Sequence, residues 1–186
     1  MHVRPRMTVG PQEYREAMSK LAGGVTIVTV SHEGELRGMT ATAFAAVSLD
    51  PPLVLVCLEK TSRTRELILS EMNFVANVLS TEQLDIATRF SRRGTKSFDD
   101  LAFEPGEEGA PRLDGVLAWV ECIVREVIDA GDHDIAIGEV VACRAAPGEP
   151  LLYFDRAYRS LPSGSTISES PGRSSGGTAP AGSSSA

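Results

Sequence analysis

The chain has 186 residues, of which 42% are hydrophobic and 23% are charged, a composition typical of one soluble domain with a core. Its formal charge of −7, without a stripe of Lys and Arg interleaved with aromatic residues, argues against nucleic acid and anionic membrane surfaces as partners. No segment reaches the roughly 18 apolar residues of a membrane span. Residues 1–10 also lack the apolar stretch of a signal peptide, so we expect a cytoplasmic protein.

The two ends of the chain differ from its middle. Residues 162–186 are mostly Ser, Gly, Pro and Ala, and they cannot offset their ordering entropy by burial. We therefore predict a disordered tail there and a flexible N-terminus over residues 1–10. Residues 11–161 contain no internal repeat and no linker, which indicates one folded domain.

The first predicted element is a helix over residues 11–22, "PQEYREAMSKLA". Tyr14, Met18 and Leu21 recur at helical spacing, and Pro11 suits a first helical turn. We expect its apolar face to cover one end of a sheet.

Strand patterns then dominate up to residue 80. Residues 24–42 read as two strands joined by a tight turn, where Gly34 can take a positive φ. The apolar run 51–59, "PPLVLVCLE", predicts a strand buried on both faces. A short helix begins at 64–67, "TREL", and residues 73–80, "NFVANVLS", form the next strand.

The remaining elements are one helix and then strands again. Ser80, with Gln83 three residues later, forms a capping-box pattern that begins a helix ending near residue 90. Strands follow over 115–128, 133–145 and 150–154. Many sequential strands with few short helices predict a mainly β fold, a closed or partly closed antiparallel barrel. No Gly-x-Gly-x-x-Gly or P-loop pattern is present, so a nucleotide would be held in another way.

Three cysteines, Cys57, Cys122 and Cys143, lie far apart among apolar neighbours. Their odd number and spacing indicate neither a disulfide framework nor a zinc site. We predict that they are buried small hydrophobic residues.

Small and hydroxyl-bearing residues fill the stretch 37–52, "RGMTATAFAAVSLDPP", where a strand would normally carry large apolar side chains. Short side chains and accessible backbone amides suit a flat aromatic ligand with polar edges. The alternative is an edge strand packed under a loop. The residues concerned are Thr40, Ala41, Thr42, Ala45, Ala46 and Ser48.

A cationic, hydroxyl-rich segment follows at 57–67, "CLEKTSRTREL". Free backbone amides at a helix N-terminus, together with Lys60, Arg63 and nearby hydroxyls, make an anion site suited to a phosphate. Ordinary helix capping by Ser62 and Thr64 is the alternative. A planar shelf followed by a phosphate cradle is the layout that flavin mononucleotide would need.

Two further candidates lie near the C-terminal end. His133 begins an apolar strand between two aspartates, and it is either functional or a surface or structural residue. No second His or Cys nearby supports a metal role. In 151–161, "LLYFDRAYRSL", aromatic and guanidinium groups could stack on a ring or hold a pyrophosphate, or could simply pack.

Several segments taken in order resemble the flavin reductase-like split-barrel family. They include "AGGVTIVTV", "GMTATAF", "SLDPPLVLVCLEKTSRT", "NFVANVLS", "IATRF", "GDHDIAIGEV" and "PLLYFDRAYRSL", and the resemblance spans residues 12–161. It is strongest with the small reductase component of two-component flavin-dependent monooxygenases. The resemblance implies a homodimeric, Greek-key-like antiparallel split barrel that passes a hydride from NADH or NADPH to FMN or FAD. The reduced flavin would then leave for a separate monooxygenase component.

The resemblance also implies roles for individual residues. Those expected against the isoalloxazine are Gly38, Met39, Thr40, Ala41, Thr42, Ala46, Val47 and Ser48. Those expected to hold the ribityl and phosphate part are Cys57, Leu58, Glu59, Lys60, Thr61, Ser62 and Thr64. Those expected near the flavin or its nucleotide extension are Phe90 and the loop Ser91 to Lys96.

The remaining implied roles concern the nicotinamide. His133 matches a histidine near the nicotinamide and is the catalytic candidate, expected to orient the carboxamide. Tyr153, Arg156 and Tyr158 match a segment that holds the dinucleotide. Glu59 departs from the family pattern, in which Asn or another neutral residue is frequent at this position. A carboxylate near the phosphate would be unfavourable unless it points away. Two other functions stay open: a non-catalytic flavin or haem carrier, and a pyridoxine-phosphate-oxidase-like enzyme.

Overall fold

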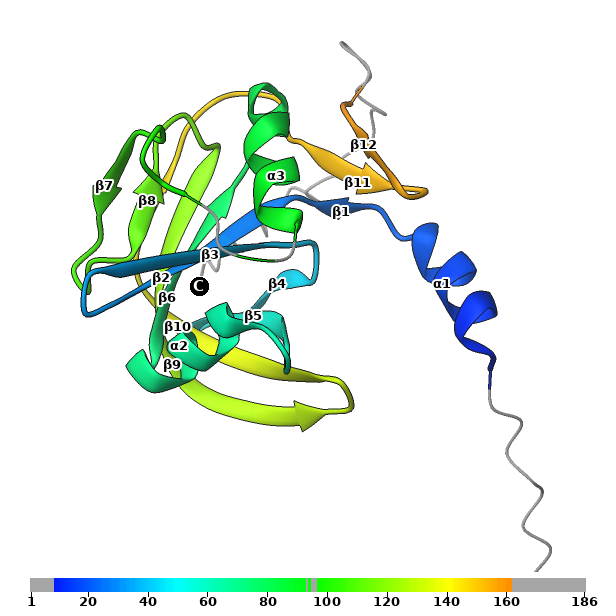
Figure 1. The fold of residues 1–186 in the computed structure, drawn as a ribbon, viewed down its shortest axis with the longest axis horizontal. Helices are drawn as coiled ribbons and strands as arrows, with labels where there is room; N and C mark the ends of the chain where they lie inside the picture. Colours follow the sequence, from blue (N-terminus) through cyan, green and yellow to red (C-terminus); the bar gives the residue numbers. More distant parts are fainter. Residues whose placement is uncertain (1–8, 93, 95–96, 162–186) are drawn as a thin grey trace, which may run out of the picture.

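The computed structural model of the chain describes residues 9–92, 94 and 97–161. The predicted tail, and all of the predicted flexible N-terminus except residues 9 and 10, lie outside this part. The described elements are α1 (Pro11–Ser19), β1 (Gly23–Gly24), β2 (Thr26–His32), β3 (Glu35–Ala41), β4 (Phe44–Leu49), β5 (Pro52–Glu59), α2 (Arg63–Glu71), β6 (Asn73–Val78), η1 (Thr81–Gln83), α3 (Leu84–Ser91), β7 (Phe103–Pro105), β8 (Pro111–Leu113), β9 (Ala118–Ala130), β10 (His133–Ala145), β11 (Leu152–Phe154) and β12 (Ala157–Arg159) (Figure 1).

One antiparallel sheet forms the body of the molecule, in the strand order β3-β2-β6-β9-β10-β5-β4 (Figure 1). The two edge strands, β3 and β4, follow each other in the chain with only Thr42 and Ala43 between them. Such a connection spans at most about 11 Å, so the sheet must curl until its two edges meet at this corner. The mainly β, antiparallel class is therefore confirmed, and within the described residues no pairing joins β3 to β4.

Local sequence signals explain several of these elements. Glu33 and Gly34 both take positive φ, 49° and 83°, in the two-residue turn between β2 and β3. The capping box of Ser80 and Gln83 is present at the start of η1, which continues directly into α3. Both features confirm their sequence predictions.

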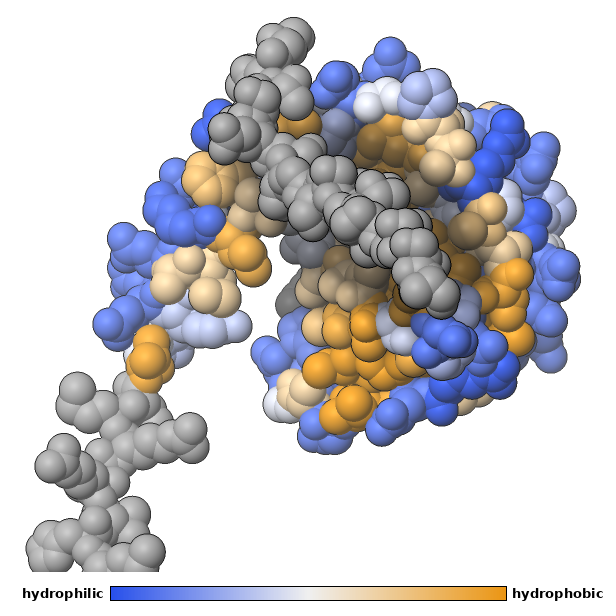
Figure 2. Space-filling model, turned by 180° about the vertical axis from the view of Figure 1, so that it is seen from behind, coloured by the Kyte–Doolittle hydropathy of each residue, from blue (hydrophilic) through white to orange (hydrophobic). Residues whose placement is uncertain are grey.

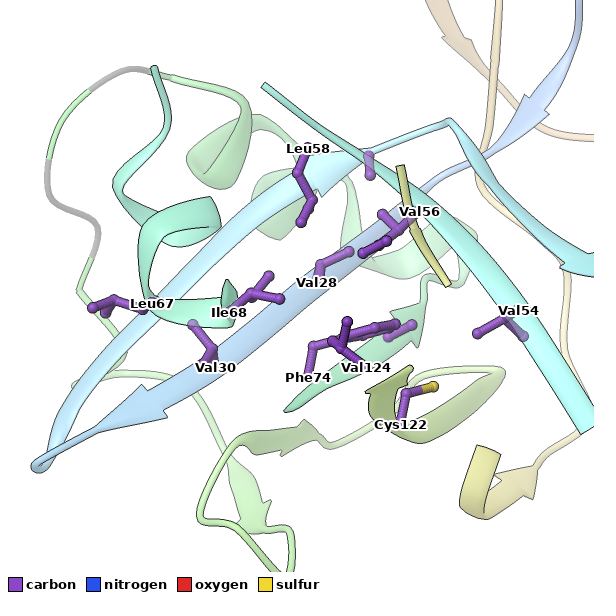
Figure 3. Packing of buried hydrophobic residues seen from close by; sticks show 13 residues of the cluster. Val28, Val30, Val54, Val56, Leu58, Leu67, Ile68, Phe74, Cys122 and Val124 are labelled. Carbon is purple, nitrogen blue, oxygen red and sulfur yellow. The ribbon is translucent and has the colours of Figure 1, made fainter. Parts of the chain in front are cut away.

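Two hydrophobic clusters fill the interior. The first lies between α2 and the sheet and includes Val28, Ile68 and Phe74 (Figure 3). The second lies beneath α3 and includes Ile27 and Phe90. Because Ile27 and Val28 are neighbours on β2, the two faces of this strand supply the two clusters.

Helix α1 differs from its sequence prediction. None of its residues is buried, and the side chains of Tyr14 and Met18 are largely exposed. The helix projects from the body beside the small β1-β11-β12 sheet (Figure 1). Its C-terminal end is held by Asp155, whose backbone N–H donates to the Ser19 carbonyl and whose carboxylate accepts from Lys20 at 2.7 Å. The expectation that its apolar face covers a sheet end is therefore wrong within this chain.

Strand β5 is buried on one face rather than two. Val54, Val56 and Leu58 are buried, whereas the alternating residues Leu53 and Leu55 are half-buried. The strand lies between β10 and β4 in a curled sheet, so only one face meets the core. Among the described helices, none combines the length and hydrophobicity required to cross a bilayer.

The three cysteines occupy different environments. Cys122 is fully buried, Cys57 is half-buried and Cys143 is exposed, so the prediction of three buried cysteines fails for Cys143. Burial raises the pKa of the Cys122 thiol to about 12, with smaller contributions from Glu121 and Cys143.

These environments predict selective thiol chemistry. Iodoacetamide at pH 8 should alkylate Cys143 and leave Cys122 unmodified in the native protein, because Cys122 is both inaccessible and almost wholly protonated. Peptide mass spectrometry would measure each site, with urea-unfolded protein as the control in which both react. Rapid native modification of Cys122 would contradict the burial described here.

Candidate active site

A cavity of about 840 Å³ opens between β3, α2, α3 and the β11–β12 hairpin, at the upper end of the size range of small-molecule sites. Figure 1 shows β3 running between the two helices. The residues lining the cavity are Arg37, Gly38, Met39, Thr40, Thr42, Glu59, Thr61, Ser62, Arg63, Thr64, Phe90, Ser91, Arg92, Gly94, Tyr153, Arg156 and Tyr158.

The floor of the cavity is the free edge of β3. This strand pairs with β2 on one side only, and the Gly38 carbonyl accepts a 3.3 Å hydrogen bond from the Thr64 hydroxyl on the other side. Backbone groups alternate in direction along a strand, so Thr40 also turns its backbone polar groups away from β2. Backbone donors and acceptors are thus available to a flat ligand with polar edges.

A close approach at Gly38 places an aromatic ring against one face of β3. An ideal Cβ built on Gly38 would lie 2.8 Å from a ring carbon of Phe90 and 3.2 Å from Phe98. The Phe90 and Phe98 rings pack against each other at an interplanar angle of 57°, with centroids 4.9 Å apart. The Thr40 hydroxyl also donates to the Ala87 carbonyl of α3 at 2.9 Å. Glycine is therefore required for α3 to pack this closely against β3.

The first turn of α2 forms a second wall. Ser62 is the N-cap residue, but no side-chain hydrogen bond caps the helix, which leaves backbone N–H groups available to an acceptor. Thr64 is buried and lines the cavity. The Glu59 carboxylate accepts from the Thr61 hydroxyl at 2.7 Å. The hydroxyls of Thr61 and Thr64 already donate within the protein, so the segment offers the Ser62 hydroxyl and backbone N–H groups to an anion.

Four arginines and one glutamate are the charged groups among the described lining residues. Arg37 donates from Nε to Glu35 at 2.6 Å, and Arg63 lies 3.8 Å from the same carboxylate. The hydrogen bond from Arg37 holds the pKa of Glu35 below its ordinary value. The cavity is therefore cationic although the protein as a whole is acidic.

The β11–β12 hairpin supplies aromatic side chains and one further cation. Tyr153 and Tyr158 pack edge to face, with ring centroids 5.3 Å apart. Asp155 and Arg156 both take positive φ in the turn. A positive φ is rare for a residue with a long side chain, and Arg156, which has one, lines the cavity.

The structure brings most of the predicted site residues together. The predicted residues that line the cavity are Gly38, Met39, Thr40, Thr42, Glu59, Thr61, Ser62, Thr64, Phe90, Ser91, Tyr153, Arg156 and Tyr158. Lys96 lies outside the described residues.

Other predicted residues lie elsewhere. Ala41 and Leu58 belong to the first hydrophobic cluster, and Cys57 is half-buried in β5. The β4 residues Ala46, Val47 and Ser48 do not line the cavity, and Val47 is 49% exposed. Lys60 points away, because its ammonium group donates to Asp129 at 2.5 Å and to the Gly131 carbonyl at 2.9 Å.

His133 lies next to the cavity rather than in its lining. It pairs across the ladder with Glu59, a lining residue, and its imidazole contacts Asp132 at 2.7 Å. Its side chain is 41% exposed. Sequence analysis missed Arg37, whose only signal was its position directly before Gly38.

Comparisons with known proteins agree with this architecture. Residues 18–162 match the family model described as "Flavin reductase like domain". The "Probable flavin reductase" of Rhizobium meliloti is 44% identical over 149 residues, which are 80% of this chain but only 48% of that protein. The reductase subunit HsaB of a flavin-dependent monooxygenase, from Mycobacterium tuberculosis, is 33% identical over 156 residues, covering 82% of this chain and 83% of HsaB.

Among solved structures, the Streptomyces globisporus NADH:FAD oxidoreductase SgcE6, in complex with NAD and FAD fragments, aligns with a TM-score of 0.80. The two sequences are 33% identical, and the match covers 86% of this chain and 99% of the other. The matched domain and the shared fold show that this chain belongs to the flavin reductase-like family.

Proposed function

We propose that this protein transfers a hydride from NADH or NADPH to FMN or FAD in the β3 cavity and supplies the reduced flavin to a separate monooxygenase component. The observation that carries the proposal is the cavity itself, which is lined by a free strand edge, aromatic residues and four arginines. Relatives named as flavin reductases, as a monooxygenase reductase subunit and as an NADH:FAD oxidoreductase support this activity.

Each wall of the cavity fits one part of a flavin. The free edge of β3 at Gly38 and Thr40 suits the polar edge of the ring system, and Phe90 offers an apolar contact. The α2 turn, with Ser62 and Arg63, suits the phosphate. When bound, the flavin accepts a hydride at N5 from C4 of the nicotinamide.

The protein's contribution is to bind, orient and exclude water. Reduction adds negative charge near N1 and O2 of the flavin, and backbone N–H groups at the β3 edge are donors already fixed by the fold. Stacking two rings at reacting distance removes the entropic cost of their meeting. Hydride transfer between the two rings therefore requires no nucleophilic side chain.

His133 is proposed to orient the nicotinamide carboxamide, with proton transfer as a secondary role. Its position across the ladder from Glu59, at the edge of the cavity, supports this role. Asp132 holds the imidazole, and the interaction with His133 lowers the pKa of that carboxyl. The aspartate therefore remains ionised where it contacts the ring.

A homodimer is part of the proposal, with the cavity at or near the interface. Several apolar side chains of the described residues lack a partner, including Tyr14 and Met18 on α1 and Val47 and Leu49 on β4. Apolar residues also gather on one face of the body (Figure 2). Exposed apolar surface of this kind is typical of protein interfaces. A second copy would cover it.

The activity predicts catalytic bleaching of flavin. Under anaerobic conditions, NADH or NADPH with excess FMN or FAD should lose flavin absorbance over many turnovers. Steady-state kinetics with all four pairs would identify the preferred substrates, and assays without protein give the background rate. A protein that binds flavin without turnover would be a flavin carrier. Turnover of pyridoxine phosphate without a nicotinamide cofactor would favour a pyridoxine-phosphate-oxidase-like enzyme.

The cavity geometry predicts a defect in the variant Gly38→Ala. Its Cβ would displace Phe90, so we expect a flavin KM about tenfold higher, since small misplacements at a site have large effects. Overpacking should also cost about 1–3 kcal/mol of stability, visible in thermal unfolding. Gly24→Ala is the matched control, because its Cβ would meet no atom within 4 Å. An unchanged flavin KM in folded Gly38→Ala would remove β3 from the site.

The proposed dimer predicts twice the monomer mass in light scattering at micromolar concentration. Leu49→Asp should shift the mass toward the monomer while circular dichroism stays unchanged, because Leu49 is 92% exposed and has no role in the core of its own chain. A fully active monomeric wild-type protein would contradict this prediction.

A further inference from the structure

We propose that the ion pair between Arg65 and Asp134 is a positioning device that fixes residues 61–64 of the cavity against the β9–β10 hairpin and so sets the affinity for flavin. The inference rests on the proposed function, because it assigns the phosphate of the flavin to the first turn of α2. Neither residue lines the cavity, so both would act through their neighbours.

The contact between the two residues is close and largely buried. Arg65 donates from both Nε and Nη2 to Oδ2 of Asp134, at 2.7 and 2.5 Å. The Asp134 side chain is only 5% exposed, and that of Arg65 is 27% exposed. Arg65 directly follows Thr64 on α2, and Asp134 directly follows His133 on β10. The pair therefore joins the two segments that the proposed function assigns to the two substrates.

A second attachment lies at the other end of the same segment. Lys60 donates to the Asp129 carboxylate and to the Gly131 carbonyl, and its backbone N–H donates to the Asp132 carbonyl at 3.0 Å. Lys60 and Arg65 thus hold residues 61–64 at both ends. Residues 61–64 all line the cavity.

Lys60 and Arg65 also neutralise like charges in the β9–β10 hairpin. Asp134 and Asp129 are directly opposite in the β9–β10 ladder, where like charges repel. Arg65 neutralises the first aspartate and Lys60 the second. Both cations come from a segment more than sixty residues away in the chain. The position of the hairpin tip and the position of the cavity segment are therefore set together.

The two attachments should differ in strength. Asp129 is 82% exposed, and an exposed ion pair contributes little. Asp134 is nearly buried, and a buried carboxylate that loses its cation is strongly unfavourable. The Arg65–Asp134 pair is therefore the attachment that holds the first turn of α2.

The test is a double-mutant cycle with Arg65→Gln, Asp134→Asn and the double variant. The dissociation constants for FMN and FAD are measured by fluorescence quenching without nicotinamide, and melting temperatures are measured in parallel. Arg65→Gln should raise the flavin dissociation constant about tenfold, because a small displacement of the turn misplaces several donors at once. The double variant should be no worse than Arg65→Gln, since residues that act as one unit are not additive. Arg65→Lys should recover part of the affinity.

Arg125 and Glu139 provide a matched control. They form a 2.6 Å ion pair between β9 and β10, and neither lines the cavity. The variant Arg125→Gln with Glu139→Gln should keep the wild-type flavin affinity.

Each other outcome has a definite meaning. A merely structural pair would lower the melting temperature and leave the flavin affinity of the folded protein unchanged, and that result would overturn the inference. Additive effects in the cycle would also overturn it. If Arg65→Gln fails to fold, the isosteric Asp134→Asn decides alone, with weaker flavin binding expected. Wild-type protein that binds flavin without NADH or NADPH turnover would contradict the proposed function but not this inference.

Discussion

The cavity depends on the way β3 is packed between two helices. The backbone of Gly38 in β3 lies against Phe90 of α3. The Gly38 carbonyl accepts a hydrogen bond from the Thr64 hydroxyl of α2. Both helices contact this strand, and β2 covers one hydrogen-bonding edge. Only the other edge stays open. A ligand bound there meets backbone donors and acceptors that the fold has already positioned, so binding requires little rearrangement of the chain.

Local signals in the sequence were sufficient for most of the fold. The alternating apolar residues of β9 and β10, the positive φ at Gly34 and the Ser80 capping box each act within a few residues, and each prediction is confirmed. The wrong prediction for α1 concerns which part of the molecule covers an apolar surface. An amphipathic pattern shows that α1 has an apolar face but not which surface meets it, and within one chain that face remains exposed.

The residues predicted for the candidate site likewise divide into those that line the cavity and those that lie elsewhere. The stretch from Gly38 to Thr42 contributes to the cavity, but the small residues continue onto β4, the opposite edge of the sheet, where they do not line it. Composition alone cannot show that the chain passes from one edge strand of the sheet, β3, to the opposite edge strand, β4. The cation Lys60 lies within a motif typical of phosphate binding, yet Asp129, 69 residues away, directs it elsewhere. Arg37 was missed because a lone arginine before a glycine has no specific signal.

The charges around the cavity also bear on how tightly it can hold a product. Net charge is a poor guide at this scale, because fields between exposed groups are screened beyond about 10 Å. Four unopposed guanidinium groups would bind an anionic reduced flavin strongly and retain it. Arg37, however, is paired with Glu35, and Arg63 donates to Glu66 at 2.8 Å. The lowered pKa of Glu35 keeps that carboxylate ionised. Arg37 and Arg63 therefore attract a bound anion less strongly than unpaired arginines would. A cavity of this kind suits the proposed release of reduced flavin to a separate component, since it orients an anion without holding it permanently.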